Sequence, residues 1–141
     1  MLDIIYSEFT HYRETRENKK EQLNIAKGMM KRALLKFYLD WTSYRNSFKY
    51  SYSGATDTLM DYSKLFIDVS VEVYDVLPTR LTNEVTGIAT RIRESVNETA
   101  LICQDYSFED ILCKSDVCAR DAYQVYMTFD EYFEEVSYNY K

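Results

Sequence analysis

The residues best suited to chemistry in this 141-residue sequence are its three cysteines, Cys103, Cys113 and Cys118. Their spacing lacks the C-x2-C pair of a zinc site. A disulfide is the better interpretation, and Cys103 and Cys118 are the predicted pair, because both fall on inward helical stripes that an antiparallel hairpin would bring together. Closing that loop would stabilise the fold by about 3 kcal/mol. Cys113 would remain free or compete for Cys103, and three reduced thiols are the open alternative.

The sequence contains no recognisable catalytic or metal-binding motif. The single histidine, His11, stands in a polar segment without a cysteine or aspartate pattern around it. Glycine-rich phosphate loops, a G-x-S-x-G elbow and an H-E-x-x-H helix are all missing. Glu131 and Glu135 share a helical face, but a di-metal bundle also needs Glu-x-x-His motifs. We therefore expect a protein that is not an enzyme and that uses no cofactor and no metal.

One modification motif is present, the N-glycosylation sequon Asn97-Glu98-Thr99. Asn97 falls off the inward stripe of its helix, so it could carry a glycan. Together with the predicted disulfide, the sequon favours a secreted glycoprotein. The first residues carry early acids and no basic region, unlike a signal peptide. We expect either a signal that is removed before Met1 or, as the alternative, a cytoplasmic protein.

Composition excludes two further classes of partner. The net charge is −6, with ten Lys/Arg against six Asp/Glu in residues 1–50 and seven against seventeen in residues 51–141. This acidity opposes nucleic-acid binding, and we expect the basic first part to pack against acidic later helices. No run approaches the ~18 apolar residues of a membrane helix. The chain is tyrosine-rich, with 14 tyrosines, a residue type that suits protein contacts.

The elements that carry these residues are predicted to be long helices, because the chain has only three glycines and one proline. Apolar residues recur at spacings of three and four over about 2–50, 57–77, 80–104 and 116–138. Pro78 ends the second of these helices. The sequence therefore predicts an all-α, antiparallel four-helix bundle in a single domain, 1–141, with residues 103–118 as a cysteine clasp between the last two helices.

The first predicted helix is the most function-like feature. Its length of about 73 Å is about twice that of the later helices, so it either overhangs the bundle or bends, near residues 13–22 or at Gly28. An overhang would expose Ile5, Phe9 and Tyr12 as an apolar surface of the kind that binds a partner. If the helix bends, the same three residues fold back into the core. Both interpretations stay open.

A weak family pattern runs from the helix that ends at Cys103, through Cys113, to Ala122-Tyr123. It resembles the secreted all-α domain of the tsetse EP-type proteins of insects. The resemblance covers roughly 40 residues and consists of cysteine spacing on amphipathic helices. The odd number of cysteines and the missing signal depart from the family's pattern. The resemblance implies an extracellular setting and a helical fold, but no mechanism.

These observations favour a non-enzymatic helical interaction protein that is secreted and acts through a protein partner or through self-association. Two alternatives remain. The first is a carrier that binds a small apolar ligand in an aromatic-lined cavity between helices. The second is an intracellular coiled-coil adaptor with reduced thiols.

Overall fold

The computed structural model describes residues 2–15, 17–48, 52–101 and 107–139, and these are helical almost throughout. The described residues contain no strand. The helices are α1 (Asp3–Glu14), α2 (Lys19–Phe48), α3 (Tyr52–Glu72), α4 (Thr79–Leu101), α5 (Ser107–Met127) and α6 (Phe129–Asn139). The prediction of an all-α fold is confirmed.

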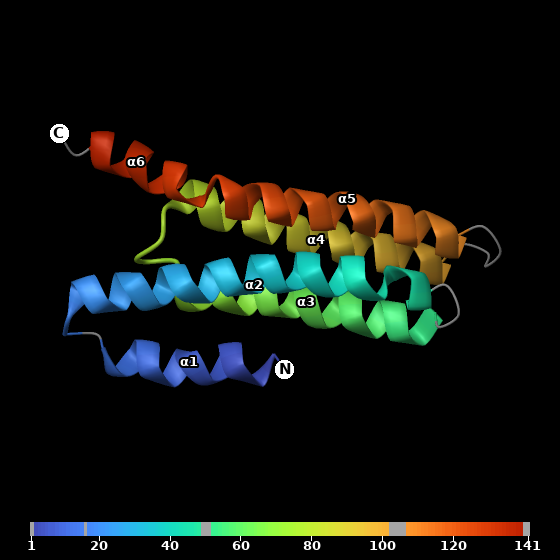
Figure 1. The fold of residues 1–141 in the computed structure, drawn as a ribbon, viewed down its shortest axis with the longest axis horizontal. Coiled ribbons are helices and arrows are strands. Elements are labelled where there is room, and N and C mark those ends of the chain that lie inside the picture. Colours follow the sequence, from blue (N-terminus) through green and yellow to red (C-terminus); the bar gives the residue numbers. More distant parts are fainter. Residues whose placement is uncertain (1, 16, 49–51, 102–106, 140–141) are drawn as a thin grey trace.

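Four long helices, α2 to α5, lie side by side with their axes roughly aligned, and successive helices run in opposite directions (Figure 1). Each contacts two of the others: α2 packs on α3 and α5, and α4 packs on the same two helices. Their apolar stripes therefore meet in one core. The short helix α1 lies outside this group and contacts α2.

The predicted first helix, 2–50, is divided into the two helices α1 and α2, so of the two interpretations left open the structure contains the bend and not the overhang. The chain turns back between α1 and α2, and α1 runs alongside α2 in the opposite direction (Figure 1). The Asn18 side chain accepts a hydrogen bond from the Glu21 backbone N–H at 3.1 Å, as an N-cap does. The break falls within the segment 13–22, whereas Gly28 lies inside the unbroken α2.

The cysteine segment is also different from its prediction, because most of it is helix. α5 begins at Ser107 rather than near residue 116. Ile111, Leu112 and Ser115 are buried in the same phase as Cys118, so the apolar stripe of α5 starts two turns earlier than expected. Within the described residues, the predicted clasp is therefore helix from Ser107 to Cys118. Residues 102–106, which join α4 to α5, lie outside the described residues.

The remaining boundaries differ in smaller ways. α3 begins at Tyr52 rather than 57, because buried Ala55 extends its apolar stripe by one turn. α3 ends at Glu72, six residues before the proline that was predicted to end it. Pro78 precedes α4, and its carbonyl accepts the Leu81 N–H at 3.0 Å. The predicted last helix is interrupted at Thr128, which separates α5 from α6. The Thr128 hydroxyl bonds back to the Gln124 carbonyl at 2.9 Å, a contact that often bends helices.

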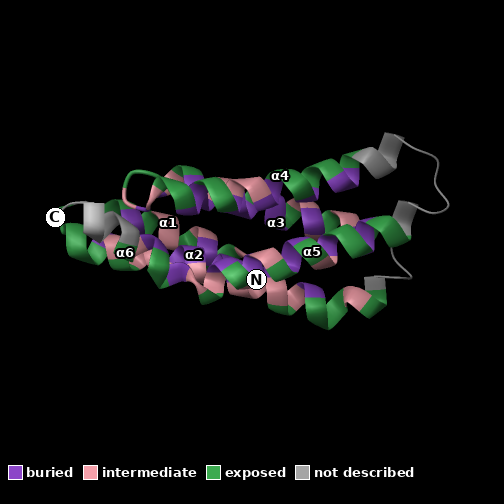
Figure 2. Ribbon diagram, turned by 90° about the horizontal axis from the view of Figure 1, so that it is seen from above, coloured by how far each residue is buried: buried purple, intermediate pink, exposed green. Residues whose placement is uncertain are grey.

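The core consists of large side chains from the inward faces of the long helices. Buried residues form continuous stripes along these inward faces, with exposed residues on the outside (Figure 2). Phe37 of α2 packs edge-on against Phe66 of α3, with 5.5 Å between the ring centroids. The apolar stripes predicted for the later helices are confirmed at these buried positions: Leu59, Tyr62, Phe66, Val69, Val73, Leu81, Val85, Ile88, Ile92, Cys118, Ala122, Val125 and Phe129.

Candidate functional site

The main candidate for a binding site is an apolar groove of about 320 Å³ where the N-terminal end of α1 meets α2. Ile4 and Ile5 line it from α1, and Leu35 and Leu39 line it from α2. Ile4 is 66% exposed and Leu39 is 49% exposed, whereas Ile5 is buried and forms the floor. Two large apolar side chains from different helices thus face solvent at the same place.

Charged residues border this groove, and each has a partner. Arg32 pairs with Glu8 of α1, and Lys36 pairs with Asp40 at 3.2 Å. Asp40 also accepts a hydrogen bond from the Tyr62 hydroxyl of α3. These contacts fix the rim of the groove, so its free surface is mainly the apolar part.

The three residues predicted as a partner face do not form an exposed surface. Ile5 and Tyr12 are buried, and Phe9 is partly buried against the core. They lie there because α1 folds back over α2 instead of overhanging, so the interpretation that places them in the core fits this structure. The neighbouring Ile4 and Leu39 are exposed instead. Leu35 and Leu39 form an i, i+4 pair off the main apolar stripe of α2, a signal in the sequence that could have indicated this second face.

Polar contacts to α3 and to the turn after it hold α1 in place. The Tyr6 hydroxyl donates to Asp68 at 2.8 Å, and the Tyr12 hydroxyl donates to Asp75 at 3.2 Å. Arg13 forms two hydrogen bonds with Glu72, at 2.6 and 2.9 Å. A tyrosine that packs its ring and donates its hydroxyl satisfies a polar group at the edge of the core. Several of the 14 tyrosines therefore serve intramolecular packing.

Tyrosine–carboxylate bonds recur elsewhere in the molecule, at Tyr62 with Asp40 and at Tyr132 with Glu84. Burial and then the bond to the carboxylate raise the pKa of Tyr6 and of Tyr62 above the ordinary value. The same two causes raise the pKa of Tyr132 to about 12. These hydroxyls therefore stay protonated, as donors require, well into the alkaline range.

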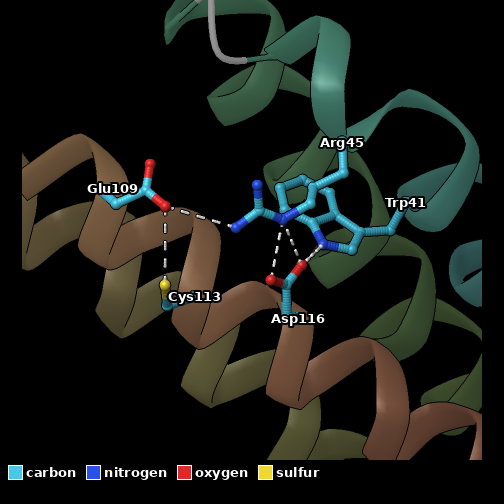
Figure 3. A network of polar contacts seen from close by, with 5 residues as sticks. All are labelled: Trp41, Arg45, Glu109, Cys113 and Asp116. Atoms are coloured by element: carbon cyan, nitrogen blue, oxygen red, sulfur yellow. Dashed lines mark hydrogen bonds and ion pairs between the residues drawn. The ribbon is translucent and has the colours of Figure 1, made fainter.

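A second polar cluster joins the C-terminal part of α2 to the N-terminal part of α5 (Figure 3). The Asp116 carboxylate accepts the Trp41 indole N–H at 2.6 Å and a bifurcated hydrogen bond from Arg45 Nε–H, at 3.0 and 2.9 Å to its two oxygens. The bond to Asp116 raises the pKa of the Arg45 guanidinium. Arg45 also reaches Glu109 at 3.6 Å, and the Cys113 thiol lies 4.0 Å from that carboxylate. This cluster pairs a basic residue from the first part of the chain with acidic residues of a later helix, as the charge distribution predicts.

The cysteines stand apart from one another in the described part of α5. Cys113 is exposed and Cys118 is buried, and both are free thiols in the structure. Residues five apart on one helix point about 140° away from each other, which agrees with this difference. Burial raises the pKa of the Cys118 thiol. Cys103 lies outside the described residues, so its pairing with Cys118 stays a prediction.

Two other candidate residues are placed by the structure. Asn97 is exposed on α4, as a glycan would require, and His11 is exposed on α1. The structure brings neither into the groove. Between α4 and α5 there is a smaller pocket of about 280 Å³, which is lined by Arg91, Glu94, Ser95, Lys114, Val117 and Cys118.

Within the described residues, no three His, Cys, Asp or Glu side chains are grouped closely enough to hold a metal ion. No helix among these residues has the length and apolar character needed to cross a membrane. Comparison of the chain with protein-family models, curated proteins and solved structures finds no match.

The Asp116 cluster leads to a prediction about stability. Asp116→Ala removes the acceptor that the buried Trp41 N–H uses and the partner of Arg45, so we expect the free energy of unfolding to fall by about 2 kcal/mol. Asp110→Ala is the matched control, because its ion pair with Lys114 is exposed and should contribute less than about 0.5 kcal/mol. Urea denaturation of both variants measures the difference. Equal losses would show that Asp116 is only a surface partner.

The raised tyrosine pKa values predict a loss of stability in alkali. The unfolded chain ionises its tyrosines near pH 10, below the folded-state values, so this stabilising contribution is complete below pH 10 and is lost as pH rises towards about 12. We expect Tyr6→Phe/Tyr132→Phe to be less stable than wild type at pH 8 and to lose less stability between pH 10 and 12. Urea midpoints across this range test the prediction. Parallel decreases in both proteins would contradict it.

Proposed function

We propose that this protein is a non-enzymatic interaction protein, an antiparallel four-helix bundle of α2 to α5 whose accessory helix α1 forms part of a binding surface for another protein. The observation that carries the proposal is the apolar groove between α1 and α2. Ile4 and Leu39 expose large apolar side chains beside it, although burial of such groups is favoured wherever the fold permits. An exposed apolar surface contributed by two helices is typical of a protein-binding site.

A carrier of a small apolar ligand is the second candidate, and the size of the groove favours it. A volume of about 320 Å³ lies at the lower end of the range for small-molecule sites. Arg32 and Lys36 at the rim could meet the acidic head of an amphiphile, but both already pair with carboxylates of this chain. Protein contacts therefore explain the groove better, because they need only its apolar part.

The secreted setting remains a proposal that depends on Cys103, Cys118 and Asn97. The exposure of Asn97 supports it. We expect the chain purified from its natural source to have one Cys103–Cys118 disulfide and a glycan at Asn97. Reduction of the disulfide should raise the intact mass by two hydrogens. Peptide mapping under non-reducing conditions identifies the pair. Alkylation of all three thiols without reduction would instead support the intracellular adaptor.

Photo-crosslinking in the native host tests the proposed protein-binding function. A photoreactive amino acid in place of Leu39 should give a discrete protein adduct, because this side chain lies at the groove and is half-exposed. The matched position is Val117, which is similarly exposed but lies between α4 and α5. A protein adduct at 39 alone supports the proposal. Absence of any protein adduct, with a small molecule retained in native mass spectra, would favour the carrier.

A further inference from the structure

The furrow between α2 and α3 is covered by α1 for only part of its length. α1 has 12 residues and is about 18 Å long, whereas the 30 residues of α2 extend about 45 Å. The polar contacts of α1 extend from Asp68 of α3 to Asp75 in the turn after this helix. The part of α3 before Asp61 lies beyond these contacts and is roughly 15 Å long. In Figure 1, α1 ends about halfway along its neighbours.

A stripe of acidic residues follows this furrow along α3. Asp57 and Asp68 are about three full turns apart and therefore lie at nearly the same angle on the helix. Asp61 and Glu72 lie within about 60° of that line by the same helical geometry, and Asp75 follows in the turn after α3. Acids at this spacing form one face, and α1 lies on the C-terminal part of it.

α1 shows what chemistry this acidic face accepts. Each of the three acids under α1 receives a donor: Asp68 from Tyr6, Glu72 from Arg13, and Asp75 from Tyr12. At the same time Ile5 of α1 is buried. A short helix with apolar residues on one side and donors on its flank is therefore already the natural occupant of this furrow.

The two N-terminal acids of the stripe have no such occupant. Asp57 and Asp61 are exposed, and neither forms an ion pair or hydrogen bond with another residue in the described part of the chain. The negative charge of Asp61 nonetheless affects tyrosines in the furrow. Burial and the bond to Asp68 raise the pKa of Tyr6, and Asp61 adds to that rise. Asp61 also adds to the raised pKa of Tyr62, after burial and the Asp40 bond.

The apolar half of the same site is the groove already described. Leu39 and Ile4 stand at the point where α1 ends, and Tyr44, which is 52% exposed, follows on α2. The neighbouring cations do not balance Asp57 and Asp61, because Lys36 pairs with Asp40 and Lys64 pairs with Asp68. The open furrow thus has exposed apolar side chains at Leu39, Ile4 and Tyr44 and a negative charge along α3.

We propose that the open part of this furrow binds a basic amphipathic helix of a partner protein, docked in line with α1. The inference rests on the proposed protein-binding function and adds the chemical class of the partner. Apolar side chains of the partner helix cover Leu39 and Ile4, and its Arg or Lys residues pair with Asp57 and Asp61. The furrow length of about 15 Å accommodates roughly three helical turns.

A designed peptide tests this partner class directly. The probe is an amidated helix with leucines at positions i, i+4, i+7 and i+11 and arginines on one flank, and its comparison peptide has glutamates in place of the arginines. We expect the basic peptide to bind the full chain and the acidic one to bind at least tenfold more weakly. Affinity of the basic peptide should fall as salt is raised, because exposed charges are screened. Fluorescence anisotropy measures all three quantities.

Matched variants locate the binding surface. Asp57→Asn/Asp61→Asn should weaken the basic peptide about tenfold, as expected for the loss of two exposed ion pairs of up to about 1 kcal/mol each. Glu131→Gln/Glu134→Gln removes the same charge from α6 and should change affinity less than twofold. Leu39→Glu should weaken both peptides, whereas Val117→Glu should not. Circular dichroism shows that each variant is folded.

Four outcomes would overturn the inference. Equal binding of both peptides, or equal effects of the α3 and α6 substitutions, would show that the acidic face of α3 does not select the partner. Self-association of the chain that is abolished by Leu39→Glu, seen by sedimentation, would assign the furrow to a second copy. If the Leu39 crosslink to a protein persists while the basic peptide fails to bind, the proposed function stands and only the partner class is wrong.

Discussion

The structure depends on one constraint, which is that α2 is apolar on two faces. Its first face, with Met30, Phe37 and Trp41, is buried in the core shared with α3 and α5. A second face carries Leu35 and Leu39, which point away from that core and line the groove. Because exposed apolar area costs about 25 cal/mol per Å² relative to burial, a helix with two such faces needs a second covering element. α1 supplies that cover by folding back.

The cover is incomplete because α1 is short, and polar contacts decide where it sits. Apolar packing alone has little directional preference, so α1 could slide along α2. The bonds of Tyr6 with Asp68 and of Arg13 with Glu72 restrict it to the C-terminal part of α3. In that position Ile5 is buried, whereas Ile4 and Leu39 remain exposed. The binding surface that we propose is therefore a direct consequence of how α1 is anchored.

The sequence predicted the parts of this fold that depend on helical period. The stripes through Phe37, Phe66 and Ile88 are buried as expected, because a 3.6-residue repeat places each residue relative to its own helix. The break before α2 falls within residues 13–22, one of the two places where a bend was expected, although this segment contains neither glycine nor proline. The signal for this break in the sequence is Asn18 followed by Glu21, which form a capping pair. The pair is hard to recognise because an exposed helix also carries polar residues at this spacing. The start of α5 was predicted too late, because the buried apolar pair Ile111 and Leu112 lies between the cysteines, in the segment assigned to the clasp.

The candidate site could not be predicted in the same way, because it depends on two helices at once. Periodicity places Ile4 and Leu39 on their own helices but cannot show that α1 stops beside Leu39. The same holds for the acids of α3, whose spacing is visible in the sequence although their division into occupied and open parts is not. Asp68 accepts a hydrogen bond from Tyr6 of α1, whereas no residue of the described chain forms a hydrogen bond or ion pair with Asp61. A partner that binds at this surface would therefore pair its donors with Asp61 and Asp57, as the donors of α1 pair with the neighbouring acids.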